Sequence, residues 1–192
     1  MTDKLSLRRK YKKLREALSE NEIAEMSLQI ANQALKLPIW EKTYYHIFLP
    51  ITSKKEVDTE FIMHILQGKD KSIAVSKAVF STGEMTHFLL QENTVLKHSK
   101  YGIPEPVSGI ELTPETIDVV FVPLLAYGKN GHRIGYGKGF YDRFLEKCSP
   151  RAIFVGLSFF EPEPEVIFNA NDVPLDFCVT PTQIFDFKNK NQ

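Results

Sequence analysis

The chain has few cysteines, no net charge and no apolar run long enough to cross a membrane. Cys148 and Cys178 are its two cysteines and lie outside any metal-ligand spacing, which favours buried thiols in a reducing compartment over a structural disulfide. The five histidines show no metal-ligand spacing either. Since 24 basic and 24 acidic residues cancel, the overall charge indicates no polyanionic partner such as a nucleic acid. The first residues contain no hydrophobic signal core, so we predict a cytoplasmic protein without a membrane segment.

The length and composition are those of one globular unit. The 192 residues are enough to bury a sizeable core, and we expect a single domain over residues 1–192. A hydrophobic content of 43% and a charged content of 25% are ordinary for a globular protein. We expect a disordered tail from about residue 188 onward, where the chain becomes polar.

The balanced total charge hides a basic N-terminal segment. Residues 1–15 contain seven basic side chains and the single acidic Asp3. Apolar residues recur at helical spacing from Leu7 to Leu18, which predicts an amphipathic helix over residues 1–18 with a basic outer face. Contact of this face with RNA or with a membrane surface is the alternative to a solvated face.

Helices and strands alternate through the rest of the chain. Ser19 followed by Glu22 matches a capping box and predicts the start of a second helix. We expect helices over residues 20–35, 58–68 and 139–148, and strands over residues 43–50, 71–80, 118–127, 151–159 and 176–181. The proline-rich stretch 101–115 is interpreted as a surface connection. The order strand, loop, helix, strand over residues 118–159 is the layout of a βαβ unit, so we predict an α/β fold with a parallel sheet.

Five of the ten glycines lie between Gly128 and Gly139, directly after a predicted strand. A loop in this position opens at the carboxyl edge of the sheet, where backbone N–H groups and the next helix N-terminus can hold an anion. Arg133 and Lys138 add two cations, which suits a di- or triphosphate better than a single carboxylate. The spacing matches neither a Walker A loop nor the dinucleotide fingerprint. A plain chain reversal is the alternative, although a simple turn needs only about one or two glycines.

Asp142 follows this loop in the first turn of the next predicted helix. A carboxylate there can ligate Mg²⁺ together with phosphate oxygens. It can equally well stabilise the positive end of the helix dipole. The spacing alone leaves both interpretations open.

The stretch GHRIGYGKGFYDRFL (131–145) resembles the signature of the 5-formyltetrahydrofolate cyclo-ligases, also called methenyltetrahydrofolate synthetases. That signature is G-x-R-[LI]-G-x-G-x-G-[YF]-Y-D-[RA]-x-L. Other segments agree with the family in order and spacing over nearly the whole chain. They are KLSLRRKYKKLR (4–15), FLPITSKKEVDT (48–59), YGIPEP (101–106), VFVPLLAYGKNGHR (120–133) and NANDVPLDFCVTP (169–181). Two positions depart from the pattern, since Phe140 stands where Tyr is commoner and Gly128 where a polar residue is frequent.

The resemblance implies a three-layer, Rossmann-like fold in which helices flank an open, mostly parallel sheet. It implies an enzyme that uses ATP and Mg²⁺ to convert 5-formyltetrahydrofolate, including polyglutamylated forms, into 5,10-methenyltetrahydrofolate with release of ADP and phosphate. In the family's proposed route the formyl oxygen attacks the γ-phosphate, and N10 of the folate then closes the ring. A monomer is expected.

The resemblance also assigns site residues by position. The residues expected to bind ATP are Lys4, Arg8, Arg133, Ile134, Gly135, Tyr136, Gly137, Lys138, Gly139, Phe140 and Tyr141. The residues expected to bind the folate are Ile51, Glu56, Tyr136, Gly137, Lys138 and Gly139. Arg133 and Lys138 are the expected catalytic cations, and Asp142 and Asp172 the expected Mg²⁺ ligands.

Several of these residues have plainer interpretations without the resemblance. Glu56 would be a surface charge beside two lysines, and Asp172 a turn residue. Tyr136 and Phe140 can stack on a pterin or adenine ring, or pack within the protein.

Two other functional classes are alternatives. One is a catalytically silent folate- or nucleotide-binding protein on the same scaffold, which loss of Asp142, Arg133 or the glycines would indicate, and none of these is lost. The other is an RNA-binding module that uses the basic helix and would bind nucleic acid with a steep salt dependence.

Overall fold

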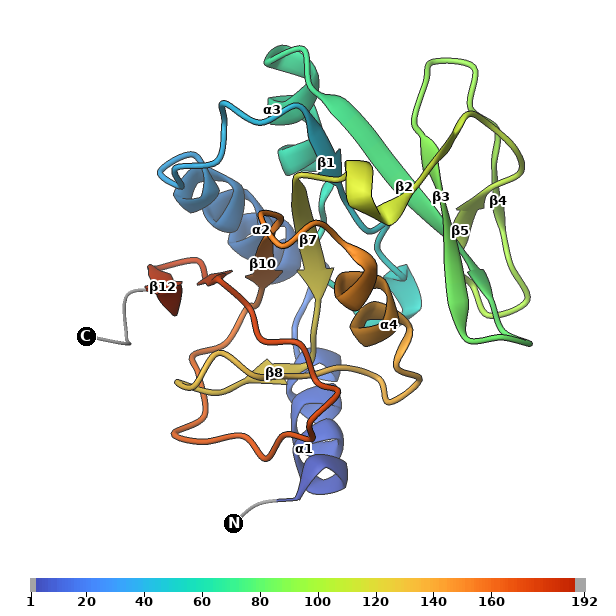
Figure 1. Ribbon diagram of the computed structural model, residues 1–192. Helices are drawn as coiled ribbons and strands as arrows, with labels where there is room; N and C mark the ends of the chain where they lie inside the picture. Colours follow the sequence, from blue (N-terminus) through green and yellow to red (C-terminus); the bar gives the residue numbers. More distant parts are fainter. Residues whose placement is uncertain (1–2, 189–192) are drawn as a thin grey trace.

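A computed structural model of the protein describes residues 3–188 (Figure 1). Its helices are α1 (Lys4–Glu16), α2 (Glu20–Ala34), η1 (Thr52–Lys54), α3 (Glu60–Gly68), η2 (Pro114–Thr116) and α4 (Phe140–Lys147), where η marks a 3₁₀ helix. The strands of the main sheet are β1 (Tyr44–His46), β2 (Ser72–Val79), β3 (Glu84–Leu89), β6 (Glu111–Leu112), β7 (Val119–Pro123), β10 (Ile153–Leu157), β11 (Phe177–Val179) and β12 (Ile184–Asp186). Two short ladders pair β4 (Leu96–His98) with β5 (Pro104–Pro106) and β8 (Ala126–Tyr127) with β9 (Arg133–Ile134).

The main sheet is open and mostly parallel, as the sequence predicts. Its strand order is β12-β11-β10-β7-β1-β2-β3-β6. The central strands from β11 to β2 run parallel to one another. β12 pairs antiparallel at one edge, and β3 and β6 pair antiparallel at the other.

Helices cover both faces of this sheet. Val119 and Phe121 of β7 pack in a core cluster with side chains of α2 and α3, whereas Val120 and Val122 pack in a second cluster with Phe144 of α4. All of these β7 side chains are fully buried, as expected for a parallel strand between two helical layers. Figure 1 shows α2 and α3 on one side of the sheet and α4 on the other. The three-layer, Rossmann-like fold is therefore confirmed.

The first two helices begin at side-chain caps. Asp3 accepts hydrogen bonds from the backbone N–H groups of Leu5 and Ser6 at 2.8 and 3.0 Å. Ser19 and Glu22 form the predicted capping box, in which each side chain accepts from the other residue's backbone N–H. Such a cap is worth about 1 kcal/mol. The caps determine where each helix starts.

The structure corrects the extent of three predicted segments. The strand predicted over 118–127 leaves the sheet after Pro123, and the apolar run continues into β8, which pairs with β9. The strand predicted over 43–50 is reduced to β1. The stretch 101–115 is more than a connection, since it contains β5, β6 and the start of η2. The expected tail begins at about residue 188, and residues 189–192 lie outside the described part of the chain.

The structure agrees with what the sequence indicates about its two cysteines and its apolar runs. Cys148 and Cys178 are both free thiols, Cys178 buried and Cys148 half-buried. Burial raises the pKa of the Cys148 thiol to about 12, so it stays protonated at neutral pH. Within residues 3–188, no helix is long and apolar enough to cross a membrane.

Candidate functional site

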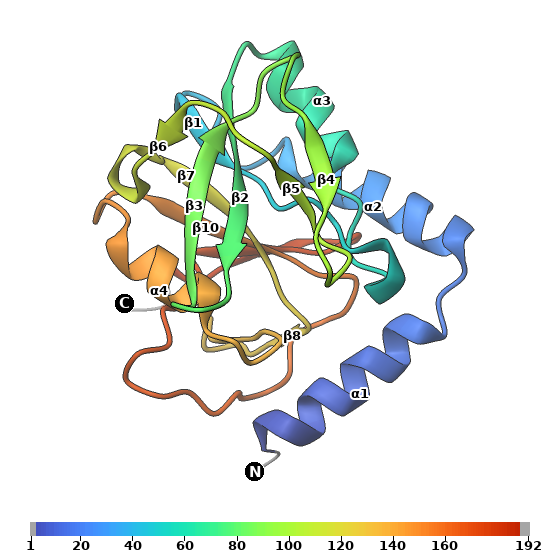
Figure 2. The same cartoon turned by 90° about the vertical axis from the view of Figure 1, so that its right-hand side faces the viewer.

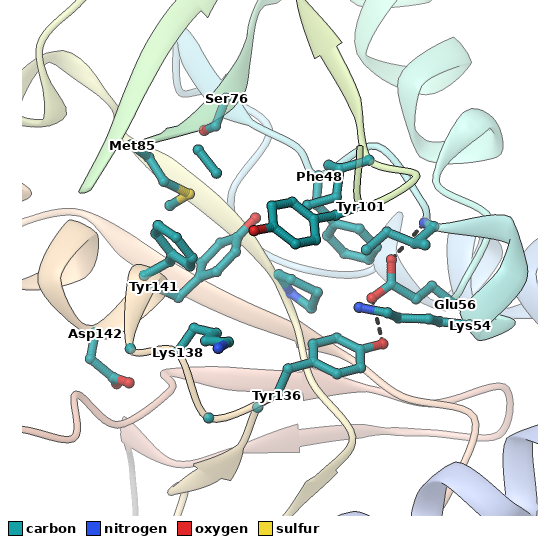
Figure 3. A pocket seen from close by; sticks show the side chains of 18 of the residues that line it. Phe48, Lys54, Glu56, Ser76, Met85, Tyr101, Tyr136, Lys138, Tyr141 and Asp142 are labelled. Carbon is teal, nitrogen blue, oxygen red and sulfur yellow. Dashed lines mark hydrogen bonds between the residues drawn. The ribbon is translucent and has the colours of Figure 1, made fainter. Parts of the chain in front are cut away.

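The candidate site lies where the connections of the sheet diverge. From β1 the chain crosses to β2 on one side, and from β7 it crosses to β10 on the other. The two crossovers leave a crevice at the carboxyl ends of these strands, which is where open α/β sheets bind ligands. A cavity of about 400 Å³ occupies this position. Figure 3 shows side chains from the segment after β1, from β2, from the β4–β5 ladder and from the glycine loop converging on it.

The glycine loop is shaped by backbone conformations that favour glycine. Gly137 and Gly139 have φ values of +92° and +71°. A Cβ atom on Gly137 would lie 3.1 Å from the Arg8 guanidinium carbon, so the missing side chain allows Arg8 to approach. Gly139 precedes α4 as its N-cap and offers no side-chain cap. The first residues of α4 line the cavity, and their N–H groups have no side-chain acceptor, as suits an anion.

Cations from two distant segments line the same part of the cavity. They include Lys4 and Arg8 of α1 together with Arg133 and Lys138 of the glycine loop. The Nε of Arg8 donates to the carbonyl oxygen of Gly135 at 2.9 Å, which fixes α1 to the loop. Arg133 is almost fully buried, and its guanidinium donates to the Val173 carbonyl and to Asp142. Burial lowers the pKa of Arg133, and the adjacent Asp142 opposes that shift.

The two predicted metal ligands lie at this cationic end. Asp142 Oδ1 accepts a 2.7 Å bond from Arg133 Nη2 and a 3.3 Å bond from the backbone N–H of Val173. Asp172 pairs with Lys4 and accepts a 2.8 Å bond from the backbone N–H of Asn169. Although burial favours its protonated form, the hydrogen bond from Lys4 helps to lower the pKa of Asp172 below its usual value.

The donor set fits Mg²⁺ only with help from a ligand. No cluster of three or more metal-ligating side chains occurs among residues 3–188. Asp142 and Asp172 both line the cavity, and Mg²⁺ is commonly held by one or two carboxylates plus substrate phosphates and water. The two carboxylates beside the phosphate-type loop match that pattern.

The opposite end of the cavity carries a buried carboxylate. Glu56 is only 5% exposed, and η1 followed by the left-handed Lys55 turns the chain so that Glu56 lines the cavity. Its Oε2 accepts the backbone N–H of Ile51 at 2.7 Å, and its Oε1 accepts the Tyr136 hydroxyl at 2.6 Å (Figure 3). The plain interpretation of Glu56 as a surface charge is therefore wrong. Carboxylate lone pairs not used by these bonds remain for ligand donors.

Apolar and aromatic side chains form the walls between the two ends. Tyr101, in the turn of the β4–β5 ladder, packs at a tilt on Phe80 with ring centroids 4.1 Å apart, and Phe80 meets the edge of Phe140 at 5.1 Å. Phe48 and Met85 also line the cavity. Phe140 thus contacts aromatic neighbours while it borders the ligand space, which leaves its stacking role a prediction.

The structure brings together nearly all of the predicted site residues. Those that line the cavity are Lys4, Arg8, Ile51, Glu56, Arg133, Gly135, Tyr136, Gly137, Lys138, Gly139, Phe140, Tyr141, Asp142 and Asp172. Ile134 differs, because its side chain is buried in a hydrophobic cluster with Leu7 and Tyr11 of α1. The Ile134 side chain packs the loop against α1 and does not line the cavity. A role of this residue in ATP binding would use its backbone.

Sequence reasoning missed some of the residues around the cavity. Tyr101 and Glu105 belong to the segment interpreted as a surface connection. His46 and Ser76 line the cavity from neighbouring parallel strands. Tyr101 had a usable signal, namely its position in the YGIPEP segment of the resemblance. His46 and Ser76 had none, because their pairing depends on strand order.

These features place the chain among the open α/β proteins that bind ligands at the carboxyl edge of the sheet. The model of the 5-formyltetrahydrofolate cyclo-ligase family matches residues 1–181, so the chain belongs to that family. It is 26% identical over 182 residues to a probable 5-formyltetrahydrofolate cyclo-ligase of Schizosaccharomyces pombe, covering 87% of this chain and 89% of the relative. It is 28% identical over 157 residues to the 5-formyltetrahydrofolate cyclo-ligase of Haemophilus influenzae, covering 80% and 83% of the two chains.

Solved structures agree with this assignment. The NMR structure of Aquifex aeolicus 5,10-methenyltetrahydrofolate synthetase superposes with a TM-score of 0.84 at 28% identity, covering 98% of this chain and 95% of that one. A 5,10-methenyltetrahydrofolate synthetase from Mycoplasma pneumoniae superposes with a TM-score of 0.76 at 24% identity, covering 94% and 99%, and shows the shared fold. The resemblance to this family, first seen in the signature loop, is therefore confirmed over almost the whole chain.

Proposed function

We propose that the chain converts 5-formyltetrahydrofolate into 5,10-methenyltetrahydrofolate with ATP, releasing ADP and phosphate. Family membership supports this activity. The observation that carries it in the structure is one cavity with cations at one end and a buried carboxylate at the other. Its volume of about 400 Å³ is in the usual range for ligand pockets. Two ligands in one such space bring their reacting groups together, which is a large part of catalysis.

The cationic end would hold the ATP phosphates. Lys4 and Arg8 would contact them from α1, and Arg133 and Lys138 from the loop. The backbone from Gly135 to Gly139 and the uncapped start of α4 add N–H donors. Arg133 and Lys138 would also stabilise the negative charge on the phosphoryl group during its transfer.

The end with Glu56 would hold the folate. A pterin offers adjacent N–H donors that can form two hydrogen bonds with one carboxylate, and Glu56 is buried, oriented and open to the cavity. Ile51 lines the same end and fixes Glu56 through its backbone N–H. The walls of Phe48, Phe80 and Met85 suit a flat aromatic ring.

Asp142 and Asp172 would hold Mg²⁺ together with phosphate oxygens, and Mg²⁺ when bound would neutralise charge on the phosphates. Both carboxylates now pair with cations, Asp142 with Arg133 and Asp172 with Lys4. When the nucleotide enters, these ion pairs would break, or their carboxylates would bind Mg²⁺ and the cation at the same time. Arg133 and Lys4 would then turn toward the phosphates.

The reaction balances with groups that the two substrates supply. The formyl oxygen attacks the γ-phosphorus and ADP leaves, which gives a phosphorylated iminium. N10 then adds to the formyl carbon, loses its proton to solvent, and the C–O bond breaks as phosphate departs with the formyl oxygen. The chain has to orient the formyl group toward the γ-phosphate and exclude water, which the apolar walls of the cavity favour.

The remaining expectations belong to the same proposal. We propose that the enzyme acts in the cytoplasm as a monomer and accepts polyglutamylated folate. A catalytically silent binding protein on this scaffold is the competing function. The intact set of Arg133, Asp142 and glycine-loop residues in the cavity supports the enzyme instead.

The activity can be measured by the absorbance of the methenyl-folate product. Purified protein, 5-formyltetrahydrofolate, ATP and Mg²⁺ should give rising absorbance that stops when ATP or Mg²⁺ is omitted. A flat trace from folded protein that binds ATP would reject the reaction and favour the silent binding protein.

A further inference from the structure

Arg15 is a buried cation at the end of α1 that the proposed reaction does not use. Its side chain is only 4% exposed. Within residues 3–188, no carboxylate lies within ion-pair distance of its guanidinium. Nη2 donates to the carbonyl oxygen of Leu124, and Nη1 donates to the Tyr136 hydroxyl at 2.9 Å. Burying a charge without an ionic partner is costly, so the groups that accept from Arg15 are significant.

The Tyr136 hydroxyl connects Arg15 to Glu56. It lies 2.9 Å from Arg15 Nη1 and 2.6 Å from Glu56 Oε1. A hydroxyl has one hydrogen, and the guanidinium can only donate. The hydroxyl must therefore accept from Arg15 and donate to Glu56. Burial and the neighbouring Glu56 raise the pKa of Tyr136, which keeps this hydrogen in place at neutral pH.

These bonds hold Glu56 from two sides. Ile51 donates to Oε2 at 2.7 Å and Tyr136 donates to Oε1 at 2.6 Å, so neither carboxylate oxygen can rotate freely. The Tyr136 ring is also held, because the ammonium group of Lys54 lies 4.3 Å from its centroid. Figure 3 shows Tyr136 and Glu56 pointing toward one another with Lys54 beside them.

We propose that Arg15 is a positioning residue for the folate: acting through the Tyr136 hydroxyl, it holds the Glu56 carboxylate in the orientation that binds 5-formyltetrahydrofolate. This inference rests on the proposed function, because it deepens the role of Glu56 in that site. It assigns Tyr136 mainly to the folate end, although Tyr136 belongs to the phosphate loop. Arg15 itself does not line the cavity and is not required to touch either ligand.

The test compares Arg15→Met, Tyr136→Phe and the double variant with the wild-type chain. Met keeps much of the apolar stem of Arg15, and Phe removes only the hydroxyl. Lys13→Met is the matched control, because Lys13 is an exposed cation on the same helix. Each chain is examined by initial rates with varied 5-formyltetrahydrofolate and varied ATP. Calorimetry measures the Kd of 5-formyltetrahydrofolate without ATP.

Each single variant should raise the KM and the Kd for 5-formyltetrahydrofolate about tenfold, as expected for loss of a hydrogen bond to a charged group. The KM for ATP should change less than about twofold. The double variant should resemble Tyr136→Phe alone, because Arg15 acts through the hydroxyl. Lys13→Met should match the wild-type chain. Additive single effects, equal changes in both KM values, or unchanged folate affinity would overturn the proposal.

The design separates this proposal from folding and from the reaction itself. Arg15→Met also loses its bond to Leu124, and circular dichroism with a urea midpoint reports any loss of fold. Tyr136→Phe keeps that bond, so unchanged folate affinity in that variant would overturn the proposal even if Arg15→Met does not fold. A wild-type chain that binds 5-formyltetrahydrofolate but forms no product would contradict the reaction alone, since the calorimetric comparison still tests Arg15.

Discussion

Asp142 shows how one side chain can serve two partners. Its Oδ1 accepts from Arg133 at 2.7 Å and from the Val173 backbone at 3.3 Å. It is also one of two carboxylates at the proposed phosphate end of the cavity. The hydrogen bonds need an acceptor oxygen, whereas Mg²⁺ needs a negative charge.

Asp142→Asn separates these demands. The amide oxygen can still accept from Arg133 and Val173, so the fold should stay intact, but the charge is lost. Turnover should fall roughly tenfold to a hundredfold, the range expected for loss of a charge-assisted contact, and should need more Mg²⁺. Rates measured against Mg²⁺ concentration test this, with the exposed Asp70→Asn as control. Asn suits the left-handed backbone of residue 70. Unchanged turnover with ordinary Mg²⁺ dependence would remove Asp142 from the site.

Two buried histidines flank Ser76 under the cavity. His46 Nε2 lies 2.6 Å and His87 Nδ1 2.9 Å from the Ser76 hydroxyl oxygen. The His87 ring packs on Phe144 at 4.0 Å between centroids. Burial lowers the pKa of His46 well below its usual value, and burial together with Lys147 lowers that of His87 to about 4. Both rings are therefore neutral in the folded protein at pH 7.

The lowered pKa values make stability depend on pH in a defined direction. Below pH 6.5 the unfolded chain takes up protons on these histidines while the folded chain does not, so stability falls as pH falls. Their contribution is fully present above about pH 6.5 and is lost toward pH 4. For His87 alone the loss between pH 7 and pH 5 should be about 2 kcal/mol.

Urea unfolding of the wild-type chain and of His87→Gln at pH 7 and pH 5 measures this loss. The variant should lose about 2 kcal/mol less than the wild-type chain over the same interval. The acidic residues contribute to both chains and cancel in the comparison. The pKa of His46 is lowered mainly by burial and also by His87, so replacing His87 changes the His46 contribution in the same direction. An equal loss in both chains would mean that His87 is not buried as a neutral ring.

At the scale of single elements, the glycine loop depends on one close approach. Gly137 has φ of +92°, and its missing side chain leaves room for the Arg8 guanidinium. Gly137→Ala should lower the free energy of unfolding by about 1–2 kcal/mol, because an L side chain is strained at positive φ. It should also raise the KM for ATP, since Arg8 must move. Urea unfolding and initial rates measure the two effects.

Gly68→Ala is the matched control for that change. Gly68 ends α3, has no positive φ, and has no atom within 4 Å of an added Cβ. Its replacement should leave activity unchanged and stability unchanged or slightly higher. A Gly137→Ala chain with the same stability and the same KM for ATP as this control would show that the loop does not need its tight approach to Arg8.

The elements could be predicted where the signal is local. The capping box at Ser19 and the strand–loop–helix order around the glycines depend on residues close in sequence. The break after Pro123 could not be predicted, because Leu124 and Leu125 continue the apolar run although they leave the sheet. Both parts of the run are apolar because both are buried, although only the first part lies in the sheet.

The candidate site was predictable only in part. The resemblance matched Glu56 and Asp172 to ligand positions, and the fold places both on one cavity. The partners that hold Glu56 could not be predicted, because Arg15 and Tyr136 are far apart in sequence and no periodicity relates them. The Ile134 side chain was matched to the loop signature, but its alternation in β9 directs it into a hydrophobic cluster.

At the scale of the whole molecule, α1 is the element whose docking should depend most on ligand binding at the site. Figure 2 shows α1 along one side of the molecule, apart from the helices that cover the sheet. It is attached by a small cluster containing Leu7 and Tyr11, by the buried Arg15 at its end, and by polar contacts of Lys4, Lys10 and Arg8. Contacts of partly exposed charges contribute little to stability. The central strands are buried on both faces instead.

Amide hydrogen exchange should therefore report ligand binding most strongly in α1. Without ligands, α1 should exchange faster than β7, because the buried position of β7 should restrict its opening to global unfolding. ATP and Mg²⁺ at about 100 times Kd stabilise the docked state by about 2.7 kcal/mol, which slows exchange about a hundredfold where opening releases the ligand. α2 lines no part of the cavity and should slow less, so it is the internal reference. If α1 matches β7 before ligand is added, or if ATP slows α2 as much as α1, then α1 is an integral layer of the fold. If only α1 responds, the helix that carries Lys4, Arg8 and Arg15 is ordered by the ligand it helps to bind.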